Sequence, residues 1–345
     1  MHLKLYNMGN TCYLNTAFQC LFSTTAFQRC VETHGRDDNE ERALIRSLHA
    51  YTEKCKTITD TNLIRSWKPV LETLKAKVGS RIDVFEQNDL CEFVLMLLDI
   101  MDTELQAPLT SLQRKSMKEE LHMPFARANS RYALSKTLGK VCVDEWISMH
   151  AKRYSDVVPS FNSMLVSQIK CGGCGKFHNN YESHSCLQLD IMDHDSIQES
   201  MQAYIRSMHF NDEEDGDSNI EWTCDGCRER HPSKKVVTFW RLGDVLLIFL
   251  KRFNYDENGR VVKIDKPVTI QEVLNMDMYL FHNFHSSTYT LSAVGCHIGS
   301  AYNGHYFSLV KRDDDWIAID DDSERKVERF DKMAETHGYM FVYKK

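Results

Sequence analysis

The sequence has no apolar segment long enough to cross a lipid bilayer. Its most apolar stretches, 93–98 and 245–250, fall far short of the ~20 residues that a spanning helix needs. The first residues also lack a basic region followed by an apolar core, so they do not resemble a secretory signal. We therefore expect a chain with no membrane association, located in the cytoplasm, the nucleus or both.

A surplus of basic residues is also missing. The 42 Lys and Arg residues are outnumbered by 49 Asp and Glu residues, which gives a net charge of −7. This balance argues against a generic phosphate-binding surface, and so against a nucleic-acid partner, and it favours a basic partner or substrate. There is no internal repeat, proline-rich linker or low-complexity tail, and 345 residues suffice for one large domain or two smaller ones.

Apolar residues follow helical spacing in the N-terminal part of the chain. The segments that this spacing predicts as helices are 10–22, 40–55 and 63–78, with a further helix after the polar residues 86–89. Asn10 or Thr11 is the expected N-cap of the first helix, since either side chain can accept a hydrogen bond from the first turn. Residues up to about 115 are therefore predicted to be mainly helical, whereas 111–160 show no clear pattern.

From about residue 161 the pattern becomes that of strands. It predicts strands at 166–170, 186–191, 236–239 and 245–252, a hairpin at 254–260 around Asn258-Gly259, and a series of short strands from 288 to 343. The acidic run 212–217 is predicted to be a solvated loop. Together these patterns predict an α+β fold with a helical N-terminal half and a β-rich C-terminal half.

Four of the twelve cysteines form two Cys-x-x-Cys knuckles, Cys171/Cys174 and Cys224/Cys227. A chain without an export signal is expected to keep its cysteines as thiols, available for metal binding or chemistry. Each knuckle places two thiolates on one tight turn, and two knuckles supply the four corners of a tetrahedral zinc site. We therefore predict a structural zinc, the alternative being a degenerate and empty site. Nothing near the knuckles suggests a catalytic metal.

Cys12 stands at the predicted N-terminus of the first helix. The helix dipole and the unpaired N–H groups there favour a thiolate, and they can also stabilise a nearby oxyanion. A single cysteine near a helix start is usually structural, so a catalytic role requires a base within reach.

A candidate base comes from a predicted hairpin near the C-terminus. We centre the turn of this hairpin between Arg312 and Asp313. In an antiparallel pair, this register places His305 opposite Asp320 on one face, as a base and its orienting carboxylate require. A one-residue shift would bring Asp321 to His305 instead, so both aspartates remain candidates.

Five motifs occur in order along the chain. They are Tyr6–Asn15 (YNMGNTCYLN), Glu86–Phe93 (EQNDLCEF), the two knuckles, Leu250–Phe253 (LKRF), and His297-x-Gly299 with Gly304-His305-Tyr306, Trp316 and Asp320-Asp321. This set resembles the cysteine box, the Gln-Gln-Asp-x-x-Glu-Phe box, the knuckles and the histidine box of the ubiquitin-specific protease family of ubiquitin carboxyl-terminal hydrolases. The resemblance runs from about residue 3 to 343, and Asn88 departs from it by replacing the second Gln.

The resemblance implies a papain-like cysteine protease fold with a helical thumb, a β-rich palm and zinc-tipped β fingers. Fingers and palm would together cup ubiquitin. A single catalytic domain would cover residues 1–345, with the thumb up to about 115, the fingers within about 161–250 and the palm from about 251 to 345.

The same resemblance implies roles for individual residues. The catalytic residues would be Cys12 as nucleophile, His305 as general base and acid, Asp320 or Asp321 as orienting acid, and Asn7 as a donor to the oxyanion. The substrate-binding residues would be Gln87 and Asp89, which hold the basic ubiquitin tail, together with Gly304 and Tyr306. Gly304 would leave room for the Gly-Gly backbone of that tail.

The implied activity is thiol-dependent hydrolysis of the (iso)peptide bond after the C-terminal glycine of ubiquitin. Zinc would be structural, no cofactor would take part in the chemistry, and the monomeric enzyme would bind ubiquitin and ubiquitinated proteins. Two alternatives remain: a protease for a ubiquitin-like modifier, and a catalytically lapsed ubiquitin-binding module. The intact Cys12, His305, Asp320 and Asn7 argue against the lapsed module. A zinc-ribbon nucleic-acid binder is disfavoured by the acidic run 212–217 between the knuckles.

Overall fold

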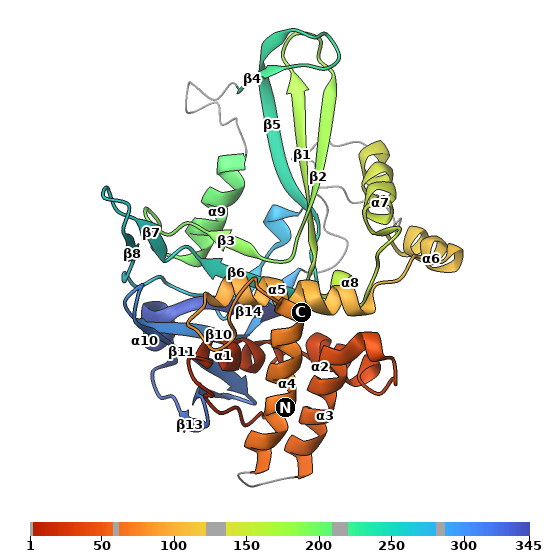
Figure 1. Cartoon of the computed structure of the whole chain (residues 1–345). Helices are drawn as coiled ribbons and strands as arrows, with labels where there is room; N and C mark the ends of the chain where they lie inside the picture. Colours follow the sequence, from red (N-terminus) through yellow and green to blue (C-terminus); the bar gives the residue numbers. More distant parts are fainter. Residues whose placement is uncertain (1–2, 58–61, 122–135, 209–219, 281–286) are drawn as a thin grey trace.

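The computed structural model describes residues 3–57, 62–121, 136–208, 220–280 and 287–345. These residues form the predicted α+β architecture. Helices gather at one end beside an eight-stranded sheet, and a four-stranded sheet projects away from them (Figure 1). The acidic run 212–217 lies outside the described residues. Within the described ranges, no helix is long and apolar enough to span a membrane.

Helices dominate the N-terminal part of the described chain. They are α1 (Cys12–Leu21), α2 (Thr25–His34), η1 (Glu40–Arg42), α3 (Ala43–Thr57), α4 (Asn62–Val78) and α5 (Leu90–Leu105). The predicted helices correspond to α1, α3, α4 and α5 and are confirmed. The sequence pattern does not predict α2, which buries only Phe27, Cys30 and Val31 and so has a narrow apolar face.

The eight-stranded sheet comes mostly from the C-terminal part of the chain. In spatial order its strands are β13 (Ser323–Lys326), β12 (Asp315–Asp320), β11 (Gly304–Arg312), β10 (Thr288–Gly299), β14 (Gly338–Lys344), β6 (Val245–Leu250) and β3 (Leu187–Leu189), and β9 (Val273–Asn275) pairs with β10. The prediction of only short strands from 288 to 343 is wrong. β10 has twelve residues, and α10 (Phe330–His337) interrupts the strands. Most of β10 is buried on both faces, which removes the alternation that would have marked its length.

Helix α1 lies at the centre of the molecule. It packs against β10, β11 and β12 and against α5, and all ten of its residues are buried. Phe18 of α1 contacts the rings of Trp67 and Phe93 edge to face, with centroid separations of 5.3 and 6.1 Å. This packing fixes the position of the first turn of α1, which begins at Cys12.

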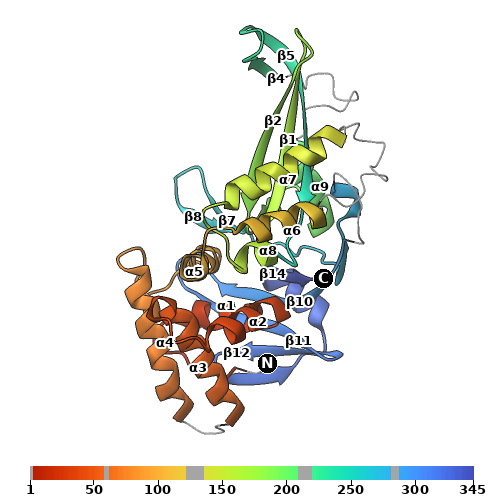
Figure 2. The same ribbon diagram turned by 90° about the vertical axis from the view of Figure 1, so that its right-hand side faces the viewer.

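The four-stranded sheet has the order β2 (Phe177–His184), β1 (Ser163–Cys171), β5 (Arg230–Arg241) and β4 (Ile220–Thr223). Figure 2 shows α6 (Ser111–Leu121) and α7 (Lys136–His150) alongside it. A separate small core joins them, in which Trp146 of α7 packs with Met164, Val166 and Trp240 of the sheet. No residue of α6 is buried, which explains why residues 111–121 show no helical pattern.

Four short elements complete the described chain. They are α8 (Val157–Phe161), α9 (Ile197–Met208), η3 (Asp277–Tyr279) and the hairpin of β7 (Phe253–Tyr255) and β8 (Val261–Lys263). The predicted hairpin around Asn258-Gly259 is confirmed, with Gly259 at a φ of +73°. β3 and β6 belong to the large sheet, so the segment 161–250 contributes strands to both sheets.

Arg252 is a fully buried cation at the junction after β6. Its guanidinium donates to the backbone carbonyls of Gly338, Ile264, Lys266 and Glu335 at 2.7, 3.0, 2.9 and 3.0 Å. Burial lowers the pKa of this guanidinium below its usual value. Arg252 therefore joins the end of β6 to the segment after β8 and to the start of β14.

Replacing Arg252 with methionine should lower the free energy of unfolding by about 3 kcal/mol or more, because four buried carbonyls lose their donors. Urea unfolding followed by circular dichroism measures this change. The matched control is Arg312→Met, which removes a surface pair with Glu324 at 2.8 Å and should cost about 1 kcal/mol or less. Equal losses in the two variants would contradict the role of Arg252.

Candidate active site

The first turn of α1 brings Cys12 to β11. Cys12 is the first residue of α1 and is 5% exposed. Helix α1 packs across β11, whose second residue is His305, and Cys12 lies close enough to His305 to raise the pKa of its imidazole. The predicted encounter of this cysteine with this histidine is therefore present in the structure.

The turn that precedes α1 is held by the side chain of Asn7. Its oxygen accepts from the N–H groups of Gly9 and Thr11 at 3.0 and 3.2 Å. Thr11 occupies the N-cap position, but its hydroxyl accepts from the N–H of Met8 at 2.9 Å and does not cap the helix. The predicted N-cap is thus Thr11 by position, but its side chain makes no capping hydrogen bond, and Asn10 lies in a left-handed turn with φ +53°. No side-chain cap competes for the first-turn N–H groups beside Cys12.

His305 and Asp320 meet, although the predicted strand register is wrong. His305 Nε2 lies 2.5 Å from Asp320 Oδ1. The pairing of β11 with β12 centres the turn between Asp313 and Asp314, and Asp313 has φ +54°, as a tight hairpin turn requires. His305 and Asp320 are consequently diagonal neighbours and not directly opposite each other. A register difference of two residues keeps both side chains on the same face, which is why they still touch.

Asp321 directs its carboxylate at two asparagines. Asn7 Nδ2 donates to Oδ2 at 3.1 Å, and Asn15 Nδ2, from the second turn of α1, donates to Oδ1 at 2.7 Å. Asp321 has φ +52° in the turn between β12 and β13, and its carboxylate lies within 4.8 Å of the His305 ring and of the Asp320 carboxylate. The adjacent aspartates thus serve different neighbours: Asp320 bonds the histidine, and Asp321 holds Asn7.

The environment of His305 favours its charged form. The hydrogen bond with Cys12 and the bond and charge of Asp320 raise the pKa of His305 to about 9, and these effects outweigh the opposing effect of burial. Because Asp320 bonds Nε2, the other ring nitrogen, Nδ1, is the one that can exchange a proton with Cys12. A protonated imidazole beside a thiol stabilises the nucleophilic thiolate.

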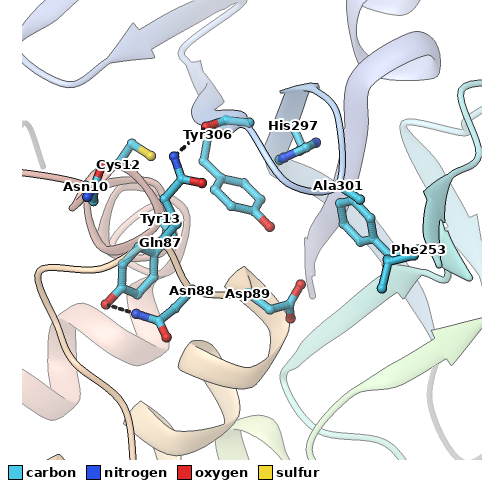
Figure 3. A pocket seen from close by; sticks show the side chains of 12 residues that line it. Asn10, Cys12, Tyr13, Gln87, Asn88, Asp89, Phe253, His297, Ala301 and Tyr306 are labelled. Carbon is cyan, nitrogen blue, oxygen red and sulfur yellow. Dashed lines mark hydrogen bonds between the residues drawn. The ribbon is translucent and has the colours of Figure 1, made fainter. Parts of the chain in front are cut away.

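A cleft of about 270 Å³ opens beside Cys12. Figure 3 shows Cys12 and Tyr13 on one wall, Gln87, Asn88 and Asp89 on another, and Phe253, His297, Ala301 and Tyr306 on the side of β7 and β11. The hydroxyl of Tyr306 and the carboxylate of Asp89 point into the same space in this view. All four residues predicted to bind substrate, Gln87, Asp89, Gly304 and Tyr306, therefore line one cleft with the predicted nucleophile.

Residues 87–89, which precede α5, lie at the edge of this cleft and make hydrogen bonds to their surroundings. Asp89 caps α5 by accepting from the N–H of Glu92 at 3.0 Å, and it also accepts from the hydroxyl of Tyr339 at 2.7 Å. Asn88, the departure from the family motif, donates to the hydroxyl of Tyr13 at 3.1 Å. Gln87 makes only a long bond of 3.5 Å to the carbonyl of Gly304, so its amide is the most easily redirected of the three.

Packing explains why position 304 is a glycine, and the sequence does not reveal this reason. A Cβ atom at this position would lie 2.0 Å from Nε2 of His297, whose ring is buried against it. Burial lowers the pKa of His297 to about 4, so this ring is neutral near pH 7. Gly304 therefore admits the His297 ring, in addition to lining the cleft.

The two cysteine knuckles converge at the tip of the four-stranded sheet. The Sγ atoms of Cys171, Cys174, Cys224 and Cys227 all lie within 4.8 Å of one another. The separations Cys171–Cys227 and Cys174–Cys224 are 3.9 and 3.6 Å. Zinc–sulfur bonds of about 2.3 Å in a tetrahedron place the sulfurs ~3.8 Å apart, so these residues fit a zinc ion. All four ligands would be protein sulfurs, which is the donor set of a structural site.

Comparison with known proteins establishes the family. Residues 3–343 match the family described as Ubiquitin carboxyl-terminal hydrolase. The chain therefore belongs to the ubiquitin carboxyl-terminal hydrolases, in agreement with the resemblance of its motifs to the ubiquitin-specific proteases.

Two curated relatives show how far this similarity extends. The chain is 24% identical over 372 residues to ubiquitin carboxyl-terminal hydrolase 4 of Candida glabrata, which covers 98% of this chain and 40% of that protein. It is 25% identical over 347 residues to ubiquitin carboxyl-terminal hydrolase 17-like protein 15 of Homo sapiens, covering 98% of this chain and 53% of that protein. The chain thus spans about half the length of these relatives.

Solved structures share the fold. A chain of the SAGA DUB module of Ubp8, Sgf11, Sus1 and Sgf73 bound to monoubiquitin aligns with a TM-score of 0.72 and 20% identity. The same module bound to ubiquitin aldehyde aligns with a TM-score of 0.71 and 20% identity. Each match covers 99% of this chain and 69% of the other. The predicted fold is therefore confirmed.

Three neighbours of the site are not identified by sequence reasoning. Asn15 lies within the first motif, and its position one helical turn after Cys12 is the only local signal. His297 stands in the last motif without an assigned role. Tyr339 has no local signal at all, because its bond to Asp89 joins residues 250 positions apart.

Proposed function

We propose that this chain is a thiol-dependent deubiquitinase, which hydrolyses the (iso)peptide bond after the C-terminal glycine of ubiquitin. The observation that carries the proposal is the chain of contacts from Cys12 through His305 to Asp320 at the edge of a cleft. Membership of the ubiquitin carboxyl-terminal hydrolases and the fold shared with ubiquitin-bound structures support the choice of substrate.

In the first half of the reaction, the Cys12 thiolate attacks the carbonyl carbon of the terminal glycine. The oxyanion that forms lies near the start of α1, where backbone N–H groups and the amide of Asn7 are the available donors. Asp321 holds the Asn7 amide through one of its two N–H bonds, which leaves the second for the oxyanion. The His305 imidazolium then protonates the departing amine, and the carbon–nitrogen bond breaks.

In the second half, water hydrolyses the thioester. His305, now neutral, accepts a proton from the water as its oxygen attacks the same carbonyl carbon. The carbon–sulfur bond breaks, ubiquitin leaves with a free carboxylate, and the Cys12–His305 pair is restored. Asp320 keeps the imidazole oriented throughout by its bond to Nε2.

The cleft would receive the ubiquitin tail. Asp89 supplies a negative charge to a basic tail, and Gln87 can exchange its long bond to Gly304 for a carbonyl of the substrate. The four knuckle cysteines would hold a structural zinc that stiffens the tip of the four-stranded sheet and takes no part in hydrolysis. We include in the proposal that the enzyme acts as a monomer in the cytoplasm or nucleus, without a nucleic-acid partner.

The test is labelling by ubiquitin that carries a C-terminal thiol-reactive group, compared with the same group on ubiquitin-like modifiers. The ubiquitin probe should label wild type and the control Cys55→Ser, which alters a half-buried cysteine elsewhere, and should fail to label Cys12→Ala. Preferential labelling by another modifier would indicate a protease for that modifier. Binding of ubiquitin without any labelling would indicate a lapsed binding module.

The pH dependence of kcat/KM tests whether Asp320 or Asp321 raises the pKa of His305. The pKa of His305 is raised to about 9, so the imidazolium that protonates the leaving amine is lost as the pH rises through that value. We expect the alkaline limb of kcat/KM near pH 9, and Asp320→Asn should move it to lower pH by removing a contact that raises this pKa. Asp321→Asn is the control and should lower kcat while leaving the limb in place. If the alkaline limb moved only in Asp321→Asn, Asp321 and not Asp320 would be the carboxylate that raises the pKa of His305.

A further inference from the structure

Two cysteines outside the zinc cluster and the active site lie side by side. Cys91 is the second residue of α5 and is 6% exposed, whereas Cys186 is half-buried in the short connection between β2 and β3. The two thiols lie close enough together for each to shift the pKa of the other. Gln188 of β3 donates from Nε2 to Cys91 Sγ at 3.5 Å. The pair thus joins α5 to the base of the four-stranded sheet.

Both thiols border space that a small reagent can enter. Cys91 lines a cavity of about 280 Å³, and Cys186 lines an adjoining one of about 360 Å³. Leu95, Gln188 and Lys251 line both cavities, so the two spaces meet at the cysteine pair. The side chain of Lys251 brings a positive charge to this meeting point.

The pKa values of the two thiols are shifted in opposite directions, as is typical of a nucleophilic cysteine and its resolving cysteine. Hydrogen bonds from Cys91 and from Gln188 lower the pKa of Cys186, although burial opposes them. The interaction with Cys186 and burial raise the pKa of Cys91 well above its usual value. Cys186 therefore gives up its proton more readily than Cys91, which makes Cys186 the more reactive thiol of the two.

We propose that Cys91 and Cys186 are a redox site that forms a reversible disulfide with hydrogen peroxide and thereby controls the position of α5. The site goes beyond hydrolysis and involves neither Cys12 nor the zinc cysteines. Its consequence for ubiquitin binding rests on the proposed function.

The reaction balances in two steps. The Cys186 thiolate attacks one oxygen of peroxide, the O–O bond breaks, Cys186 becomes a sulfenic acid, and the hydroxide released takes the proton of Cys91 to form water. The Cys91 sulfur then attacks the Cys186 sulfur, and the sulfenic oxygen leaves as a second water after protonation by solvent. Two thiols lose two electrons, and one peroxide is reduced to two waters. A dithiol reductant reverses the disulfide.

The disulfide would act on the tail-binding end of the cleft. A sulfur–sulfur bond is ~2.05 Å long, so its formation would draw the first turn of α5 and the β2–β3 connection together. Asp89, two residues before Cys91, caps this turn and lines the cleft beside Tyr306. A shift of α5 therefore moves the carboxylate proposed to meet the ubiquitin tail.

The experiment uses residues 1–345, loaded with zinc and carrying Cys12→Ala, so that oxidation of the nucleophile does not interfere. After treatment with dilute hydrogen peroxide and alkylation of the remaining thiols, non-reducing peptide mass spectrometry should find a Cys91–Cys186 linked pair that dithiothreitol removes. Affinity for ubiquitin, measured by fluorescence polarisation, should fall by about fivefold or more on oxidation and recover on reduction. The added substitution Cys186→Ser should abolish both changes.

The chain contains its own control pair. Cys20 and Cys296 also interact, but both are completely buried and burial raises the pKa of each thiol, so neither should cross-link. Equal cross-linking of both pairs, or alkylation of Cys91 and Cys186 as free thiols after peroxide, would overturn the site. A disulfide that leaves ubiquitin affinity unchanged would overturn its control of α5. Absence of ubiquitin binding even in the reduced protein would refute the proposed function. The peptide masses would still show whether the Cys91–Cys186 disulfide forms.

Discussion

Replacing His305 with alanine should lower kcat/KM for a fluorogenic ubiquitin C-terminal amide by ~10³-fold or more. The imidazole lies beside Cys12 and bonds Asp320, and in the proposed mechanism it protonates the leaving amine. Without it, Cys12 loses its positively charged neighbour. Ubiquitin affinity should change little, because His305 lies at the reacting end of the cleft.

A second histidine–aspartate pair provides the matched control for this measurement. His34 Nε2 lies 2.8 Å from Asp156 Oδ2, on α2 and away from the cleft. His34→Ala should leave kcat/KM within about twofold of wild type, since a surface pair contributes little to stability. A loss of less than about tenfold in His305→Ala, or an equal loss in His34→Ala, would contradict the assignment of the base.

Removing the predicted zinc should produce the largest structural effect. We expect one zinc per chain in freshly purified protein, and none after Cys174→Ser or treatment with a strong chelator. Structural zinc in isolated fingers is worth about 10–16 kcal/mol at pH 7, so its loss should release the tip of the four-stranded sheet. Hydrogen exchange should accelerate at residues 171–178 and 222–233, which surround the cluster, while α1 and α5 keep their protection.

Two comparisons make the zinc prediction specific. Cys55→Ser changes a half-buried cysteine far from the knuckles along the chain and should retain full zinc content. Elemental analysis that finds no zinc in the wild-type protein would show that the four sulfurs are not a zinc site. Unchanged exchange at the tip after zinc removal would show instead that β1, β2 and β5 hold the sheet without it.

Local patterns in the sequence were sufficient for most of the secondary structure. Helices with a wide buried face, such as α1 and α5, produce a clear apolar periodicity. Periodicity did not predict three elements. In α2 the buried face is narrow, in α6 no residue is buried, and in β10 most residues are buried on both faces. In each failure the missing information was the neighbour against which the element packs.

The sequence by itself determined the chemistry of this protein, because that chemistry depends on residue types at short spacings. A cysteine at a helix start, two Cys-x-x-Cys turns and a histidine followed by a hairpin can each be recognised within about 20 residues. Their order along the chain then identified the family, which the match over residues 3–343 confirms.

Tertiary structure alone decided which side chains contact one another. The packing of α1 on β10–β12 brings Asp321 to Asn7 and leaves Asp320 for His305, a choice that the hairpin register could not make. The same packing of distant segments brings Cys186 to Cys91 and surrounds Arg252 with carbonyls. These contacts join residues far apart in the chain, and periodicity along one segment carries no information about the side chains of another.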